Sequence, residues 1–109
     1  DAFQQTDVSR YGRGGILGMG ALLTKTSYPH RTSPVLRGNW LLQSVLGTRL
    51  PPPPNNVPKL DENTASAKSL RERLERHRAD KACASCHDKM DPMGFALEAF
   101  DPIGRLRTS

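Results

Sequence analysis

The spacing of hydrophobic residues predicts one clear amphipathic helix in the first half of the chain. Ser33 suits the N-cap position and Pro34 suits the first helical position, so we expect the helix to begin there. Gly47 is expected to end it, because glycine adopts the left-handed backbone that often follows a helix. The residues predicted to face inward are Val35, Leu36, Trp40, Leu41, Val45 and Leu46.

The residues that precede this helix carry weaker patterns. Residues 1–13 are polar and aperiodic, and we expect them to form an extended arm. Residues 14–24 are apolar and predict a short buried helix, which their interior glycines would weaken. Residues 25–33 are expected to form a loop, and the sequence predicts no strands.

Proline and polar residues separate this half of the chain from the next. Residues 51–58 read PPPPNNVP, and consecutive prolines favour an extended polyproline II segment. Such a segment is a stiff spacer or, alternatively, a docking site for a partner that binds proline-rich sequence. Residues 59–68 are expected to form a solvated loop.

A second helix is predicted just before the cysteines. Ser69 and Glu72 have the spacing of a capping box, and the helix is expected to run to about Ala79. Its inward-facing residues are expected to be Leu70 and Leu74.

A short helix that carries the cysteines is expected next, followed by two similar turns. Residues 91–94 and 101–104 both have Asp first, Pro second and Gly fourth, which suits a type I turn. The residues expected to pack inward between the turns are Phe95, Leu97 and Phe100.

Composition limits how the chain can fold. Only 36% of the 109 residues are hydrophobic, and nine prolines and nine glycines restrict regular structure. A chain of this size buries roughly 65% of its unfolded surface, so a large apolar cofactor would help it fold. We expect one compact domain. Residues 1–58 would supply the arm, the first helix and the proline-rich segment, and residues 59–109 the module with the cysteines.

The net charge of +5 indicates a basic surface rather than a nucleic-acid interface. One Trp, two Tyr and three Phe do not alternate with basic residues, so nucleic acid is not an expected partner. No stretch reaches the roughly 20 apolar residues of a membrane span. The chain begins at Asp1 and shows no signal-peptide pattern, so we expect it to be a mature or trimmed fragment of a longer protein.

The two cysteines carry the clearest chemical signal. Residues 83–87 read Cys-Ala-Ser-Cys-His, the spacing by which c-type haem is attached. Residues three apart lie on one side of a helix, so Cys83 and Cys86 can reach the two vinyl groups of one porphyrin. His87 then offers an imidazole nitrogen to the iron. We therefore expect an all-α, cytochrome c-like domain, with long extended and proline-rich loops around one covalent haem c.

Three other interpretations use the same residues. A CxxC redox disulfide would be expected in a βαβ context. A structural zinc site needs about four ligands, so Cys83, Cys86 and His87 would require a remote His or Asp. Chance occurrence is the third. The haem interpretation is favoured because the chain has no further cysteine, so both thiols are used.

The sequence leaves the sixth ligand of the iron open. Met90 lies on the same turn as His87, hence on the same side of the porphyrin, and Met93 would need a sharp reversal of the chain. The remaining candidates are Met19, His30 and His77, or else Tyr28 or an open site. Each of the first three also has a simpler interpretation. Met19 would be a core methionine, His30 a solvated histidine, and His77 a cation at a helix C-terminus or a hydrogen-bond donor to a propionate.

Further contacts to the haem can be assigned by chemistry. A ligating histidine normally donates its other N–H, and we expect a backbone carbonyl near Pro92 to accept it from His87. Arginine and the indole N–H suit propionates, which we expect at Arg31, Arg37 and Trp40. Core packing is an equal alternative for Trp40.

Several blocks of residues 14–107 resemble the large secreted planctomycete-type cytochromes, whose C-terminal modules have no assigned function. The blocks stand in the same order: RTSPVLRG, the proline run, CASCH and DPMGFALE. In that family the position of His77 often carries His, as here. The positions of Tyr28 and His30 often carry His and Asn or Thr instead. The resemblance implies an exported haem protein in a multidomain chain.

Together these observations predict a module that transfers single electrons through a haem. One alternative is a haem enzyme, or a gas- or peroxide-binding domain, with an open sixth site. Another is a cell-surface interaction module in which the haem is structural. The sequence assigns no catalytic residue. The basic surface favours an acidic redox partner. Haem c is attached outside the cytoplasm, so we expect the protein in the periplasm, on the cell surface or outside the cell.

Overall fold

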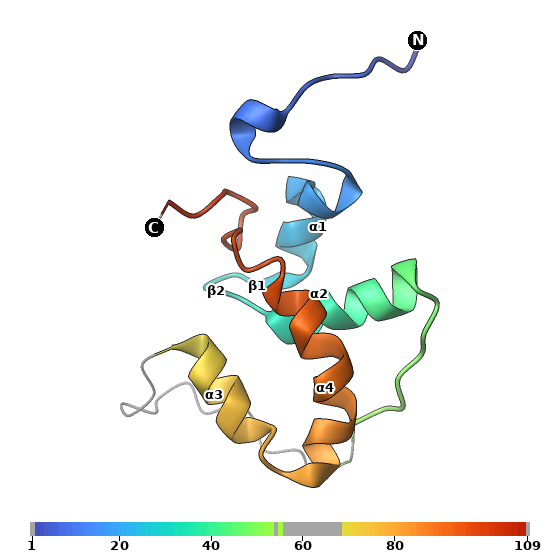
Figure 1. The fold of residues 1–109 in the computed structure, drawn as a ribbon, viewed down its shortest axis with the longest axis vertical. Helices are drawn as coiled ribbons and strands as arrows, with labels where there is room; N and C mark the ends of the chain where they lie inside the picture. The colour runs from blue at the N-terminus through green and yellow to red at the C-terminus, as the bar shows by residue number, and fades with distance from the viewer. Residues whose placement is uncertain (1, 54, 56–68, 109) are drawn as a thin grey trace.

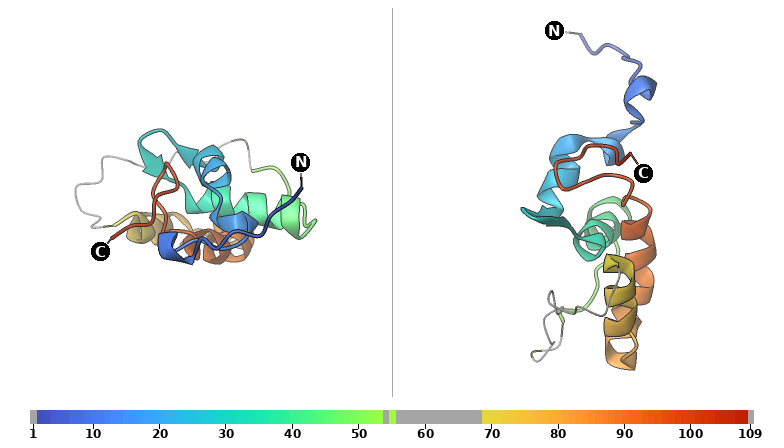
Figure 2. Two further views of the ribbon diagram at one scale, coloured as in Figure 1. Left: turned by 90° about the horizontal axis from the view of Figure 1, so that it is seen from above. Right: turned by 90° about the vertical axis from the view of Figure 1, so that its left-hand side faces the viewer.

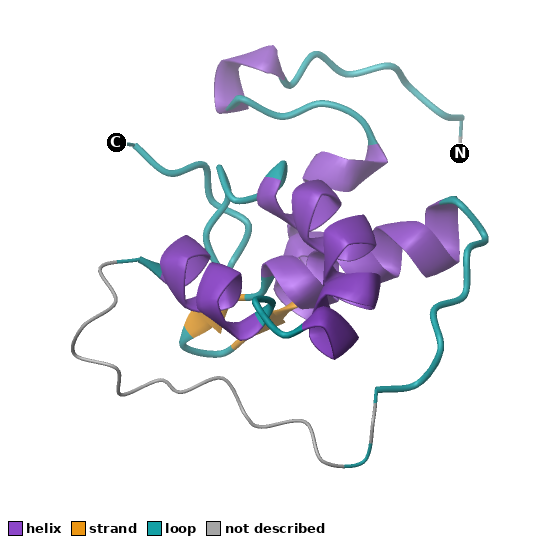
Figure 3. Cartoon of the chain, turned by 60° about the horizontal axis from the view of Figure 1, so that its bottom comes forward, coloured by secondary structure: helices purple, strands orange, loops and turns teal. Residues whose placement is uncertain are grey.

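The computed structural model describes residues 2–53, 55 and 69–108 (Figure 1). The predictions of polyproline II at 51–58 and of a loop at 59–68 therefore fall largely outside the described residues. In the described part, helices dominate (Figure 3). None of the described helices is long and apolar enough to cross a membrane.

The N-terminal third combines short helices with a small hairpin. Two 3₁₀ turns, η1 (Ser9–Tyr11) and η2 (Ile16–Gly18), precede helix α1 (Gly20–Lys25). Strands β1 (Ser27–Tyr28) and β2 (Arg31–Thr32) then pair in antiparallel fashion. The helical character expected for the fold is confirmed, but it is not purely all-α. The expectation of a strand-free loop at 25–33 is wrong, because strands of two residues are too short to show periodicity.

Helix α2 (Pro34–Trp40) begins where the sequence predicted and continues as a π-helical turn, η3 (Leu41–Val45). The Ser33 side chain accepts a hydrogen bond from the backbone N–H of Leu36, which confirms the cap. The predicted inward face is only partly right, since Leu36, Val45 and Leu46 are exposed. The residues that α2 and η3 bury are Pro34, Arg37, Gly38, Leu41 and Leu42.

Contact between α2 and α4 (Lys81–Phe95) explains this change of face (Figures 1 and 2). The two helices cross with their backbones close together. A Cβ atom on Gly38 would collide with the carbonyl oxygen of Met90, and one on Gly94 with the carbonyl oxygen of Pro34. Glycine is therefore buried at the crossing, although the hydrophobic pattern of α2 does not point to it.

The second predicted helix is confirmed as α3 (Leu70–His77). The Ser69 side chain accepts a hydrogen bond from the backbone N–H of Glu72 at 3.2 Å, as in a capping box. Leu74 is buried, as expected. Residues 78–80 then lead into α4, whose N-cap is Asp80.

Helix α4 runs through the first predicted turn. Residues 91–94 are helical and Pro92 lies inside the helix, so the prediction of a turn there is wrong. Proline in a helix interior removes one backbone hydrogen bond and costs about 3 kcal/mol. Packing against α2 offsets this cost, because the neighbouring Met90, Asp91 and Gly94 are all buried. The second predicted turn is confirmed, with the N–H of Gly104 bonded to the carbonyl of Asp101.

The small core lies between α1, η3 and the residues after α4. Its buried members are Leu23, Leu41 and Leu97, and the partly buried residues packed against them are Leu17, Trp40, Met93 and Phe100. The first turns of α4, which carry the two cysteines, lie away from this core, at the opposite end of the molecule from α1 (Figures 1 and 2).

Candidate functional site

Both cysteines lie on the first turns of α4. The Asp80 side chain accepts a hydrogen bond from the N–H of Ala82 at 2.8 Å and so fixes the start of this helix. Cys83 and Cys86 are free thiols, and both are partly exposed. A three-residue spacing on a regular helix brings the two thiols to one side, where both are open to a ligand.

His87 follows on the same helix and is held by a carboxylate. Its Nδ1 donates to Oδ1 of Asp91 at 3.0 Å. The His87 side chain is 14% exposed and the Asp91 side chain is fully buried. Because Nδ1 is used, Nε2 is the ring nitrogen available to a metal.

The sequence predicted a different acceptor for His87, a backbone carbonyl near Pro92. In the structure Pro92 is exposed within α4, and the acceptor is the side chain one residue earlier. The four-residue spacing of His87 and Asp91 is the signal that could have found this pair, because residues four apart on a helix are neighbours. The prediction of a turn at 91–94 placed Asp91 outside the helix, so the pair was not predicted.

Of the three candidates for a sixth ligand, the structure brings His77 to His87. The two rings meet edge to face, with centroids 5.5 Å apart and planes at 76°. His30 instead stacks on Tyr28 between β1 and β2, with ring centroids 6.3 Å apart. Met19 precedes α1 and is 54% exposed. Helix α1 lies at the far end of the molecule from the first turns of α4 (Figure 1).

The side chain of Arg37 is buried and hydrogen-bonded to the backbone, and it is not open to a ligand. Its guanidinium is completely buried, and it donates to the carbonyl oxygens of Leu97, Phe100 and Asp101 at 2.8 to 3.0 Å. Burial lowers the pKa of Arg37, and the nearby charge of Glu98, 3.1 Å away, opposes that shift. The side chain thus holds together the segment that follows α4, and its guanidinium is occupied by these carbonyls and not free for a propionate.

The other two residues predicted to bind propionates are also engaged elsewhere. The Arg31 guanidinium lies 4.5 Å from the centre of the Tyr28 ring. Trp40 packs against the core, which agrees with its alternative interpretation. The structure therefore does not bring Arg31 or Trp40 together with Cys83 and His87 into one cluster.

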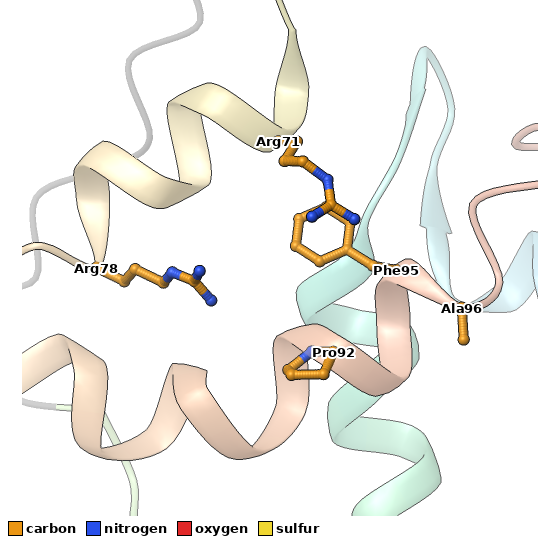
Figure 4. Close-up of a pocket in the computed structure, with 5 residues that line it drawn as sticks. All are labelled: Arg71, Arg78, Pro92, Phe95 and Ala96. Atoms are coloured by element: carbon orange, nitrogen blue, oxygen red, sulfur yellow. The ribbon is translucent and has the colours of Figure 1, made fainter.

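A cavity of about 380 Å³, which the sequence analysis did not predict, lies between α3 and α4. Arg71 and Arg78 extend into it from the α3 side, above Pro92 and Phe95 of α4 (Figure 4). The Arg71 guanidinium lies 4.3 Å from the centre of the Phe95 ring. Arg71 and Arg78 thus bring two guanidinium groups to one cavity, and guanidinium groups suit carboxylates and other anions.

Among residues 2–53, 55 and 69–108, no three His, Cys, Asp or Glu side chains are clustered as a metal ion would require. A family model described as PSCyt3, protein of unknown function (DUF1588), matches residues 13–109. No curated protein and no solved structure matches the chain.

Proposed function

This chain belongs to the PSCyt3 family (DUF1588), whose function is unknown, and we propose that it is a module that binds one haem c covalently and transfers single electrons. The observation that carries the proposal is the arrangement of three side chains on α4. Cys83 and Cys86 are free and partly exposed, and His87 follows directly with one ring nitrogen already bonded to Asp91. These residues fit a covalently bound haem.

In this proposal each side chain has a defined task. Cys83 and Cys86 would hold the haem covalently, through thioether bonds to its two vinyl groups. Nε2 of His87 would ligate the iron, and Asp91 would keep the proton on Nδ1. When bound, the haem supplies a one-electron couple whose potential the protein sets through ligands and burial.

His77 is the residue best placed to act as the sixth ligand. It stands at the end of α3, its ring is in contact with that of His87, and only residues 78–80 separate α3 from α4. In this proposal His77 would supply the second imidazole to the iron, because the fold already holds its ring beside that of His87. Ligation by two histidines fits an electron carrier, because no position is then open to substrate.

Charge and chemistry also suggest where the module works. Attachment of haem c takes place outside the cytoplasm, so we propose that the protein works in the periplasm, on the cell surface or outside the cell. A net charge of +5 attracts acidic surfaces at long range, so we propose an acidic redox partner.

The test is spectroscopy of the protein produced in a host that attaches haem c. We expect a Soret band and a pyridine haemochrome spectrum of the c type. The haem should also stay with the protein during acid–acetone extraction, because it is covalently bound. The Cys83→Ser, Cys86→Ser double variant should lose the bound haem. Ser85→Ala, between the two thiols and exposed, is the matched control and should retain it.

The same spectra distinguish the alternatives. A wild-type protein without a Soret band would overturn the haem proposal and favour a zinc site or a CxxC disulfide. A low-spin spectrum that CO does not change supports electron transfer with two histidine ligands. A high-spin spectrum that shifts fully with CO would mean an open sixth site and would favour the enzyme or gas-binding function.

A further inference from the structure

We propose that Asp91 is a positioning residue that gives His87 a partly anionic character and thereby stabilises the ferric form of the bound haem. This inference rests on the proposed function, because it concerns the ligand of that same haem. The module would then have a lowered reduction potential, and Asp91 would be the residue that lowers it.

The contact between the two side chains is close and built into one helix. Nδ1 of His87 and Oδ1 of Asp91 are 3.0 Å apart, and the residues are four apart on α4. Both side chains are fixed by burial, which is complete for Asp91 and leaves His87 14% exposed. The hydrogen bond is therefore a property of the folded helix and not of two mobile surface groups.

The surroundings of Asp91 in the described residues direct its charge toward His87. Within the described part of the chain, His87 is the only basic side chain at ion-pair distance from Asp91. The second carboxylate oxygen, Oδ2, is buried and has no hydrogen-bond partner among these residues. Because burial weakens dielectric screening, the negative charge of Asp91 acts mainly on the imidazole of His87.

This charge has a definite effect on an iron bound at Nε2. Ferric haem carries one more positive charge than ferrous haem, so a nearby negative charge stabilises the ferric state more. A carboxylate also draws the Nδ1 proton more strongly than a backbone carbonyl does, which makes the ligand a better electron donor. Both effects lower the reduction potential.

The experiment is a redox titration of the haem-bearing protein, followed by absorbance. The variant Asp91→Asn keeps the size of the side chain but removes its charge. At a fixed potential near the wild-type midpoint, we expect its ratio of ferrous to ferric haem to be at least tenfold higher. A tenfold change corresponds to about 59 mV for a one-electron couple. Asp91→Glu should stay closer to the wild type than Asp91→Asn does.

Asp88→Asn is the matched control. Asp88 is on the same helix, next to His87 in sequence, but is exposed. Removing its charge should change the ratio by less than about twofold, because solvent screens exposed charges. If Asp91→Asn does not yield folded protein, Asp91→Ser provides the same comparison with a smaller side chain.

The outcomes separate the two proposals. Haem-bearing variants of Asp91 with an unchanged ratio would overturn this inference and leave haem attachment standing. An equal shift in Asp88→Asn would also overturn it, since contact with His87 would then not matter. Absence of haem from the wild-type protein, detected in the same samples, would instead refute the proposed function.

Discussion

Replacing Gly38 by alanine tests the crossing of α2 and α4 on which the fold depends. An added Cβ would collide with the carbonyl oxygen of Met90 and come within 3.2 Å of the backbone nitrogen of Gly94. Both obstacles are backbone atoms of a helix, which cannot rotate away as a side chain can. The helices must therefore move apart or the crossing must tilt.

The expected loss of stability combines two opposing effects. In an unobstructed helix, exchanging glycine for alanine stabilises by up to about 1 kcal/mol. Forcing an extra carbon into a packed contact destabilises by about 1–3 kcal/mol or more. A clash with backbone belongs at the upper end of that range, so we expect Gly38→Ala to lower the free energy of unfolding by about 2–3 kcal/mol. The total free energy of unfolding of a folded domain is only about 5–15 kcal/mol, so this loss would be large.

Urea unfolding followed by circular dichroism measures this loss. With a slope of about 1–3 kcal/mol per molar urea, the midpoint should fall by roughly 0.7–3 M while the slope stays constant. Gly14→Ala is the matched control, because a Cβ there meets nothing within 4 Å. Its midpoint should change little, as exposed substitutions shift stability by about 0.5 kcal/mol or less. Equal midpoints for the two variants would refute the close crossing.

Two further substitutions test the roles of His77 and Arg37. His77→Ala should convert a low-spin haem spectrum into one that shifts with CO, whereas His30→Ala should leave the spectrum unchanged. The reverse result would assign the sixth ligand to His30, between β1 and β2. Arg37→Lys keeps the charge but loses most of the hydrogen bonds to three carbonyls, so it should lower the free energy of unfolding in urea by about 3 kcal/mol. Arg105→Lys, at an exposed position, is its control, and a similar small change in both would contradict a structural role for Arg37.

The helix starts could be predicted because their signals are local. Ser33 and Ser69 each bond to the backbone N–H three residues later, and such a bond needs only the first turn of the helix. Pro34 at the first helical position works in the same way, since it lacks an N–H that would have no partner there. None of these signals depends on what the helix later packs against.

The buried face of α2 could not be predicted, because it depends on a distant segment. Hydrophobic spacing chose Leu36 and Val45, which are exposed, and passed over Arg37, which is fully buried. Arg37 is inside because the turn at residues 97–101 supplies the acceptors for its guanidinium. A pattern of single residues cannot show that acceptors sixty residues away will be present.

The error at residues 91–94 matters most for the candidate site. Had the chain turned at Asp91, the carboxylate would not have faced His87, since the contact needs both residues on one continuous helix. The helix continues through Pro92 because its neighbours Met90 and Gly94 pack against α2. Gly38 and Gly94 thus allow the close approach that keeps this part of α4 helical, and the buried carboxylate of Asp91 on that helix in turn orients His87. The crossing of α2 and α4 supports both the fold and the histidine that we assign to the iron.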